Sequence, residues 1–375
     1  MIRHKRPALL LSMIATLSGS AAAAAALGGE PNAPNTWVKL PVGKVNGPHR
    51  LDPRGWTSLR YEPGTRRLIW FVAEETERRI YSNCLWFYDP DRNDWTSEPN
   101  PYAIPKPEGK DAMAYRADHP MTRHPYRGNA VDPENKVYIQ HGGVGYGQGL
   151  DDTWAYDLEK GAWKDLKPGA HPRGGLGPAL VYIPELKGIL SHGGMTNGNS
   201  MADTWFFDVK AGTWKDLKAA NTPRGSDHDL VYDPKSKVCV TFLDGKTWVY
   251  EVAANAWKTV DGPGPASRSH YGLTCDQEQG IVVLFAGQGK EDDPRARVQT
   301  EPKWGAPQKG IFTDTWLFDT AARAWHDLGK EKDLDPDKCA DRPFNLAWDS
   351  SRKLVFGVGA GTAVWAFKPQ LPKKQ

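Results

Sequence analysis

Short apolar runs, each preceded by a tight polar turn, recur along this chain. In every case a turn rich in Pro, Asp, Gly, Lys or Ser leads into β-branched or apolar residues, which is typical of a buried strand that follows a hairpin turn. The segments are YEPGTRRLIW from residue 61, VDPENKVYI from 131, YIPELKGIL from 182, YDPKSKVCV from 232, CDQEQGIVVLF from 275 and WDSSRKLVF from 348. The pattern therefore predicts six β-hairpins.

Another hairpin follows each of the first five, marked by two tryptophans nine residues apart. Each first Trp opens an alternating apolar stretch that ends in a turn, and each second Trp opens another short stretch. This spacing puts both rings at corresponding points of a hairpin and not on one helix face. The pairs are Trp86/Trp95, Trp154/Trp163, Trp205/Trp214, Trp248/Trp257 and Trp316/Trp325. Two hairpins per unit predict four antiparallel strands, which is typical of a propeller blade.

The sixth unit contains Trp365, and no second tryptophan follows it. Trp37, in TWVKLP near the other end, matches the missing position. We therefore expect residues 36–41 to supply the fourth strand of the last blade, so that the N-terminal strand closes the ring and covers its exposed edge. The predicted fold is all-β, a six-bladed β-propeller occupying residues 27–375 as one domain. The expected blades are 58–100, 127–168, 173–219, 224–261, 268–329 and 342–368 plus 36–41.

The order of arginine, hairpin, glycine pair, Asp-Thr-Trp and second Trp resembles the kelch repeat over essentially all of residues 36–368. The resemblance implies a kelch-type propeller, similar to galactose oxidase-like propellers and to secreted bacterial kelch proteins. Its strongest motifs are the glycine pairs after His141 and His192 and the triplets that begin at Asp152, Asp203 and Asp314. The sequence departs from the glycine pair at Ala73-Glu74-Glu75 and at Asp244-Gly245.

Residues 1–26 have the composition of a secretory signal peptide. Arg3, Lys5 and Arg6 precede an apolar run over 8–17, which is too short to span a bilayer comfortably, and small residues follow. We expect cleavage, a periplasmic or extracellular location and no membrane insertion.

The mature chain has no net charge. The full sequence has 48 Lys+Arg against 45 Asp+Glu, and residues 1–26 hold three basic and no acidic residues, so their removal leaves equal numbers. A mature chain with no net charge has no global attraction for polyanions, so we expect no nucleic-acid partner.

Cysteine chemistry stays open at this stage. In an oxidising compartment the cysteines can pair in more than one way, or they can be buried as small apolar residues. None has the CxxC spacing of a structural zinc site. The four are Cys84, Cys239, Cys275 and Cys339.

One arginine stands just before the first strand of each expected blade. Kelch domains that capture acidic peptides use arginines at this position, and the planar guanidinium binds carboxylate or phosphate with two hydrogen bonds. The resemblance also implies that the loops entering the first strands share a face with the loops between second and third strands. The alternative is a scaffold role, in which each arginine binds loop carbonyls or a neighbouring blade. The candidates are Arg54, Arg127, Arg173, Arg224, Arg268 and Arg342.

Two long loops fall on the same face, at about 97–126 and 287–312. Loops of this length in a compact repeat protein are usually functional or disordered. Trp304 lies in the second loop and is not explained by the blade pattern, so it joins the arginines as a candidate ligand-binding residue. We expect a pocket at the channel mouth, walled by these loops.

Histidines supply the candidate chemistry. His141 and His192 occupy equivalent positions, and Asp244 takes that position in the fourth blade, so the three would ligate a metal if they converged. Hydrogen bonding to loop backbone is the alternative. His228 and His270 are candidate proton shuttles. No phosphate-binding, dinucleotide-binding or nucleophile motif occurs in a suitable context, and no cofactor is predicted.

The sequence predicts an exported, monomeric recognition module for an anionic saccharide or an acidic protein segment. The alternative is a carbohydrate-active enzyme, because secreted six-bladed kelch mutarotases are similar in size and export. A metal-dependent oxidase is less favoured. Copper-radical oxidases of the galactose oxidase type use a related propeller with an extra blade and a Tyr–Cys crosslink, and this chain has no persuasive match to that crosslink.

Overall fold

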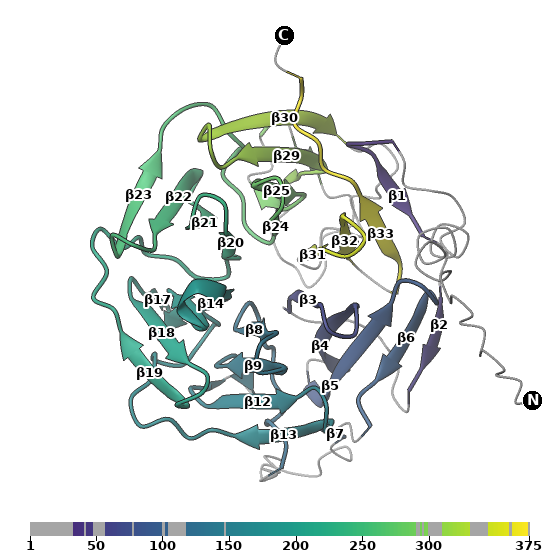
Figure 1. Ribbon diagram of the computed structural model, residues 1–375, viewed down its shortest axis with the longest axis vertical. Coiled ribbons are helices and arrows are strands. Elements are labelled where there is room, and N and C mark those ends of the chain that lie inside the picture. Colours follow the sequence, from purple (N-terminus) through teal and green to yellow (C-terminus); the bar gives the residue numbers. More distant parts are fainter. Residues whose placement is uncertain are drawn as a thin grey trace, which may run out of the picture.

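The computed structural model describes residues 33–40, 43–47, 57–76, 79–99, 102–103, 118–145, 148–289, 293–294, 296–298, 310–330, 344–359 and 362–373. These residues form a six-bladed β-propeller, which confirms the predicted fold (Figure 1). Each blade has four antiparallel strands, with the first strand nearest the axis and the fourth on the outside. The described residues contain one short helical turn, η1 (Pro184–Leu186). The expected signal peptide, residues 1–26, lies outside the described residues.

The blades follow one another along the chain. Blade 1 contains β3 (Leu59–Glu62), β4 (Arg67–Thr76), β5 (Arg79–Asp89) and β6 (Asp94–Ser97). Blade 2 contains β8 (Asn129–Asp132), β9 (Val137–His141), β12 (Thr153–Asp157) and β13 (Ala162–Asp165). Blade 3 contains β14 (Ala179–Ile183), β15 (Gly188–His192), β18 (Thr204–Asp208) and β19 (Thr213–Asp216).

Blade 4 contains β20 (Val231–Asp233), β21 (Val238–Leu243), β22 (Lys246–Glu251) and β23 (Ala256–Val260). Blade 5 contains β24 (Gly272–Asp276), β25 (Ile281–Phe285), β29 (Asp314–Asp319) and β30 (Ala324–Lys330). Blade 6 contains β31 (Asn345–Asp349), β32 (Leu354–Val358), β33 (Val364–Phe367) and, from the other end of the chain, β1 (Trp37–Lys39).

Short ribbons decorate this frame. Between second and third strands, β10 (Val144–Gly145) pairs with β11 (Gln148–Gly149), and β16 (Met195–Thr196) pairs with β17 (Asn199–Ser200). In blade 5, β28 (Gly310–Ile311) pairs with both β26 (Gln288–Gly289) and β27 (Arg297–Val298). In blade 1, β7 (Tyr102–Ala103) pairs with β5. We call the face that carries the loops entering the first strands the loop face, and the opposite face, with the turns between first and second strands, the turn face.

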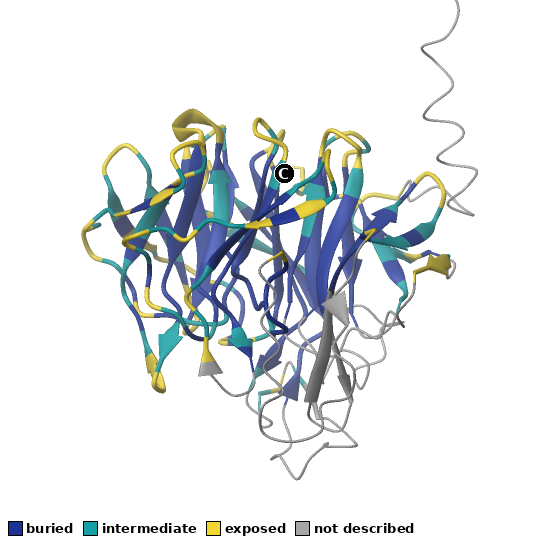
Figure 2. Ribbon diagram, turned by 90° about the horizontal axis from the view of Figure 1, so that it is seen from below, coloured by how far each residue is buried: buried dark blue, intermediate teal, exposed yellow. Residues whose placement is uncertain are grey.

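The core lies between the blades, and Figure 2 shows buried residues along the strands and exposed residues at the turns. The second Trp of each pair is packed there, and its indole N–H donates to the preceding blade. The acceptor is a threonine hydroxyl at four interfaces: Trp214 to Thr153 (3.0 Å), Trp257 to Thr204 (3.0 Å), Trp325 to Thr247 (2.7 Å) and Trp37 to Thr315 (2.9 Å). Where this threonine is missing, Trp163 donates to Glu98 Oε2 (3.0 Å) and Trp95 to the Thr362 carbonyl (3.4 Å).

The N-terminal segment closes the ring as predicted, because β1 pairs antiparallel with β33 in the register Trp37↔Phe367. The chain then continues to β2 (Lys44–Asn46), which pairs parallel with the outer strand β6 of blade 1, Val45 opposite Trp95. This second strand was not predicted, since three exposed residues carry no alternating pattern. One segment therefore holds the two blades that meet at the closure (Figure 1).

The three described cysteines, Cys84, Cys239 and Cys275, are buried free thiols in the blade cores, and Cys339 lies outside the described residues. Burial raises the pKa of each of the three thiols, which keeps them protonated. Within the described chain, no helix has both the length and the apolar character needed to cross a membrane.

Replacing Thr204 by Val should destabilise the protein by about 1–3 kcal/mol, because the buried Trp257 indole N–H loses its acceptor. Denaturant unfolding of the variant and the wild type measures the difference. Thr213→Val is the matched control: Thr213 is exposed on the neighbouring strand, so the change there should stay within about 0.5 kcal/mol. Equal effects at both positions would show that the bond between blades contributes nothing.

Candidate functional site

The candidate arginines do not occupy equivalent positions. Arg268 is buried in blade 5: its Nε donates to the Ala266 carbonyl (3.0 Å), NH1 donates to the Ala286 carbonyl (3.1 Å), and both terminal nitrogens bind the Asp314 carboxylate. Trp316 Nε1 donates to the same carboxylate at 2.8 Å. This guanidinium is engaged inside its own blade, as the scaffold alternative describes.

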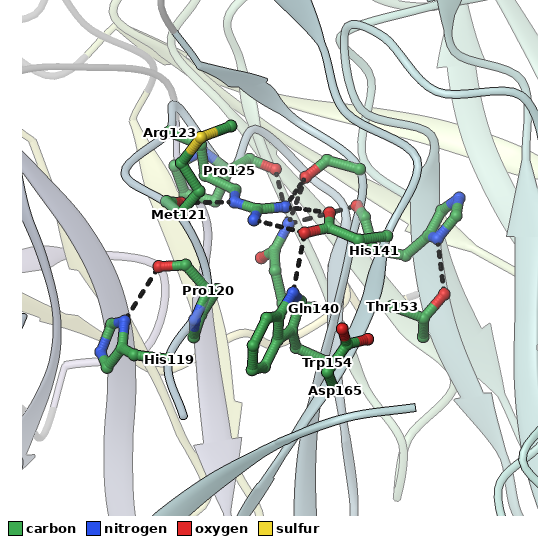
Figure 3. A network of polar contacts seen from close by, with 12 residues as sticks. His119, Pro120, Met121, Arg123, Pro125, Gln140, His141, Thr153, Trp154 and Asp165 are labelled. Carbon is green, nitrogen blue, oxygen red and sulfur yellow. Dashed lines mark hydrogen bonds and ion pairs between the residues drawn. The ribbon is translucent and has the colours of Figure 1, made fainter. Parts of the chain in front are cut away.

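Arg123 makes the corresponding contacts in blade 2, as Figure 3 shows. Its Nε donates to the Met121 carbonyl (2.9 Å), NH1 donates to the Gly142 carbonyl (3.0 Å), and NH2 binds Asp152 Oδ2 (2.7 Å), which also accepts from Trp154. From the sequence alone, Arg127 and not Arg123 was taken as the repeated arginine of blade 2. The distance along the chain from each arginine to the end of the following first strand could have shown that the arginines are not equivalent, because it varies from five residues for Arg127 to ten for Arg173.

Arg127 lies on the propeller axis and is 1% exposed. NH1 donates to the Thr57 carbonyl (3.1 Å) and to Asn345 Oδ1 (2.7 Å), and NH2 donates to the Tyr271 carbonyl (3.0 Å). NH1 also lies 3.1 Å from Asp229 Oδ2. These partners belong to, or lead into, the first strands of blades 1, 6, 5 and 4. One side chain from blade 2 thus joins five blades at the loop-face end of the channel.

Arg173 and Arg224 are the described candidates that remain exposed. They flank the β16–β17 ribbon: Arg224 NH1 donates to the Ser200 carbonyl at 3.0 Å, and Thr196 donates to the carbonyl of Gly174, next to Arg173. Arg54, Arg342 and Trp304 lie outside the described residues, as does most of both long loops. The structure therefore brings together two of the six arginines around one ribbon of the loop face.

The proposed metal ligands lie apart. His141 Nδ1 is 2.9 Å from Thr153 Oγ1 and its ring packs on Trp214, whereas His192 packs on Trp257, one blade further on. Asp244 is exposed in a turn with φ of 51°. The described part of the chain holds no group of three His, Cys, Asp or Glu side chains placed to bind a metal. These three residues do not form one site.

His192 and His228 form a buried imidazole pair. His192 Nε2 faces the Pro223 carbonyl at 3.1 Å and must donate, so His192 Nδ1 accepts from His228 Nε2 at 2.9 Å. Both rings are then neutral. Burial lowers the pKa of His192 to about 4, and burial, with the neighbouring His192 imidazole adding to it, lowers the pKa of His228 well below its usual value. His228 is 1% exposed and lies inside the protein.

His270 is placed differently. Its Nε2 lies 3.1 Å from Asp227 Oδ2, its Nδ1 lies 2.8 Å from Ser269 Oγ, and both side chains of the His–Asp pair are partly exposed, at 18% and 17%. His270 and Asp227 both adopt left-handed backbone conformations, with φ of 57° and 52°. Asp and His adopt this conformation more readily than most residues, and it recurs in many turns of the described chain. This pair is the described arrangement best suited to proton transfer.

Acid should destabilise the fold through the buried imidazoles. Burial lowers the pKa of both His141 and His192 to about 4, whereas the unfolded side chains titrate near 6.5, so the unfolded state binds more protons between these values. Stability should therefore be lost as pH falls from about 6.5 to about 4, by up to about 3 kcal/mol for each imidazole. Denaturant unfolding across this range measures the slope.

The matched variants are His141→Gln and His192→Gln, each of which removes one titrating group. Each should flatten the dependence of the unfolding free energy on pH, even where it lowers the stability at pH 7. A slope that both variants leave unchanged would contradict the assignment of acid sensitivity to these rings.

No protein-family model matches this chain. The fold is therefore established by the strand arrangement itself, as a six-bladed β-propeller of four-stranded antiparallel blades. Such a frame is compatible with a binding module, since propellers present long loops around one end of a channel.

Proposed function

We propose that this chain is an exported kelch-type propeller that recognises a carboxylate-bearing ligand, an anionic saccharide or an acidic protein segment, on its loop face. In this proposal the mature protein acts as a monomer in the periplasm or outside the cell, without a cofactor. The signal-like composition of residues 1–26 supports export.

Two repeated local structures support the kelch assignment. The Arg–Asp–Trp cluster recurs with the same bonds in blades 2 and 5. The glycine pairs have nearly the same left-handed φ values in blades 2 and 3: 67° and 108° at Gly142 and Gly143, 68° and 111° at Gly193 and Gly194. A Cβ at Gly193 would stand 2.4 Å from the Gly225 carbonyl oxygen, so this turn requires glycine.

The observation that carries the proposal is the exposure of Arg173 and Arg224 beside the β16–β17 ribbon. Arg268 is bound within its blade and Arg127 within the axis, so neither guanidinium is presented to a ligand. Among the described residues, the Arg224 guanidinium makes one hydrogen bond, to a backbone carbonyl, which leaves further N–H groups to donate to a carboxylate. Two exposed guanidinium groups on either side of one ribbon suit an extended anionic ligand.

Arg173→Ala and Arg224→Ala should each weaken binding of polygalacturonate or of a polyglutamate peptide by about tenfold, since each removes one charge-assisted contact. Calorimetric titration of the mature chain measures this, with uncharged dextran as the blank. Lys210→Ala is the matched control, because Lys210 is an exposed cation in the turn between β18 and β19.

Binding of polygalacturonate alone would indicate a saccharide ligand, and binding of the polyglutamate peptide alone would indicate a protein ligand. Binding that Lys210→Ala weakens as much as the two arginine variants would reduce the effect to overall charge. Failure of the wild type to bind either probe would overturn the proposal.

The His270–Asp227 pair favours a second candidate, a carbohydrate-active enzyme of epimerase or mutarotase type. A partly exposed imidazole next to a carboxylate is suited to general acid–base catalysis. The pair lies on the loop face, in the segments that enter the first strands of blades 4 and 5. His228, buried against His192, does not reach that surface.

For the second candidate, His270→Gln and Asp227→Asn should each slow anomer interconversion of aldoses and sugar acids by about 10²-fold or more. Nuclear magnetic resonance of freshly dissolved single anomers measures the rate. His228→Gln should leave the rate within about twofold where the variant stays folded. A wild-type rate equal to that of buffer alone would exclude this activity.

A further inference from the structure

A cavity of about 220 Å³ lies on the propeller axis, enclosed by the first strands of all six blades. Its walls come from successive residues of the six segments that form or lead into the first strands: three residues in five blades, and two, Ala130 and Val131, in blade 2. The innermost level is mostly leucine: Leu59, Leu180, Leu230, Leu273 and Leu346. The next level is small: Ala130, Val181, Val231, Thr274 and Ala347. The level nearest the turns is largely aromatic: Tyr61, Tyr182, Tyr232 and Trp348.

We call this space the axial cavity. It opens on the turn face, where the lining residues Pro63, Pro184 and Gln277 are exposed. At the loop-face end, the Arg127 network occupies the axis. The axial cavity is therefore entered from the side opposite to Arg173 and Arg224.

In the cavity wall, one residue at the level of the small side chains is charged. Arg60 stands where the other five blades have Ala, Val or Thr, and its side chain is 15% exposed within the cavity wall. Its Nε donates to the Asn129 carbonyl (2.9 Å) and NH1 donates to the Leu59 carbonyl (3.2 Å). Arg60 and these five small residues line the same cavity.

Arg60 is the cavity-lining member of a buried polar cluster that also contains Arg127, Asn129 and Asp229. Arg60 NH2 lies 3.6 Å from Asp229 Oδ1 and Arg127 NH1 lies 3.1 Å from Asp229 Oδ2, so two guanidinium groups share one carboxylate. Arg127 Nε and Asn129 Nδ2 are buried without an acceptor among the described residues. Burial lowers the pKa of Arg60 against the opposing pull of Asp229. An additional anion would relieve this imbalance.

The acidic residues nearer the mouth serve another purpose. Asp132, Asp233, Asp276 and Asp349 end the first strands, and each accepts backbone N–H groups of its own turn, with the nearest at 2.9 to 3.0 Å. Asp349 is also bound by Arg352. These carboxylates are engaged in closing the turns, so they do not supply the counter-charge that Arg60 shares with Arg127.

We propose that the axial cavity binds a small organic anion, with Arg60 holding its carboxylate and the aromatic level enclosing its body. The volume corresponds to about seven water molecules at about 30 Å³ each, below the range of about 300–1,000 Å³ typical of pockets for drug-sized ligands. The ligand is accordingly the size of a monosaccharide or smaller. This site is separate from the loop-face site, and neither depends on the other.

The test titrates benzoate and glucuronate into the full mature chain by calorimetry, with benzyl alcohol and glucose as their uncharged counterparts. At least one carboxylate should bind about tenfold or more tightly than its neutral counterpart. Arg60→Met, which keeps most of the volume and removes the charge, should weaken that binding at least about tenfold, and Arg60→Lys should retain part of it.

Val181→Phe provides an independent arm, because Val181 is half-buried in the cavity wall and a larger side chain fills the space without touching the charge. It should abolish binding, whereas Val181→Ala should preserve it. Arg173→Ala and Arg224→Ala should leave binding unchanged, which separates this site from the loop-face site. The proposal is overturned if neither carboxylate binds, if the neutral compounds bind equally well, or if Val181→Phe binds as the wild type does.

Discussion

The hydrogen bond from one blade's tryptophan to the preceding blade is the interaction on which the rest of the structure depends. Each indole ring fills the space between two sheets, and a buried indole N–H must find an acceptor there. Four interfaces use a threonine that is the first or second residue of the third strand. The other two lack that threonine, and a glutamate or a backbone carbonyl takes its place. All six interfaces thus keep the bond, while its acceptor differs.

Six blades joined in this way leave a narrow space on the axis, and that space decides where chemistry can occur. Towards the loop face, Arg127 fills it and binds first strands or their entry segments in four other blades. Towards the turn face, small side chains leave the axial cavity open beside Arg60. Burying two guanidinium groups with one carboxylate is costly unless further hydrogen bonds support it, and backbone carbonyls provide them here. The axial cavity and the Arg127 network therefore lie at opposite ends of the axis, and Asp229 joins them.

Repetition in the sequence predicted the fold far better than the site. The tryptophan spacing and turn signals predicted six four-stranded blades, because each blade must solve the same packing problem. Arginines before the first strands also recur, but they do not share a structural role: Arg268 braces its own blade, Arg127 braces the axis, and Arg173 and Arg224 are exposed. In blade 2 the bracing contacts are made by Arg123, which lies nine residues before the end of β8, against eight for Arg268 before the end of β24. The loops that enter the first strands differ in length between blades. An arginine motif in such a loop therefore does not determine where its side chain lies in the structure.

The sequence by itself determined the fold class, the number of blades and closure by the N-terminal strand, because these follow from strand periodicity and from the need to cover sheet edges. Only the tertiary structure decided which polar residues meet. The His192–His228 pair, the His270–Asp227 pair and the grouping of Arg60, Arg127 and Asp229 each join residues of different blades. Such contacts depend on the rotation between blades and on the level that each residue occupies along its strand. The sequence pattern of a single repeat shows neither the rotation between blades nor the level of a residue relative to the other blades.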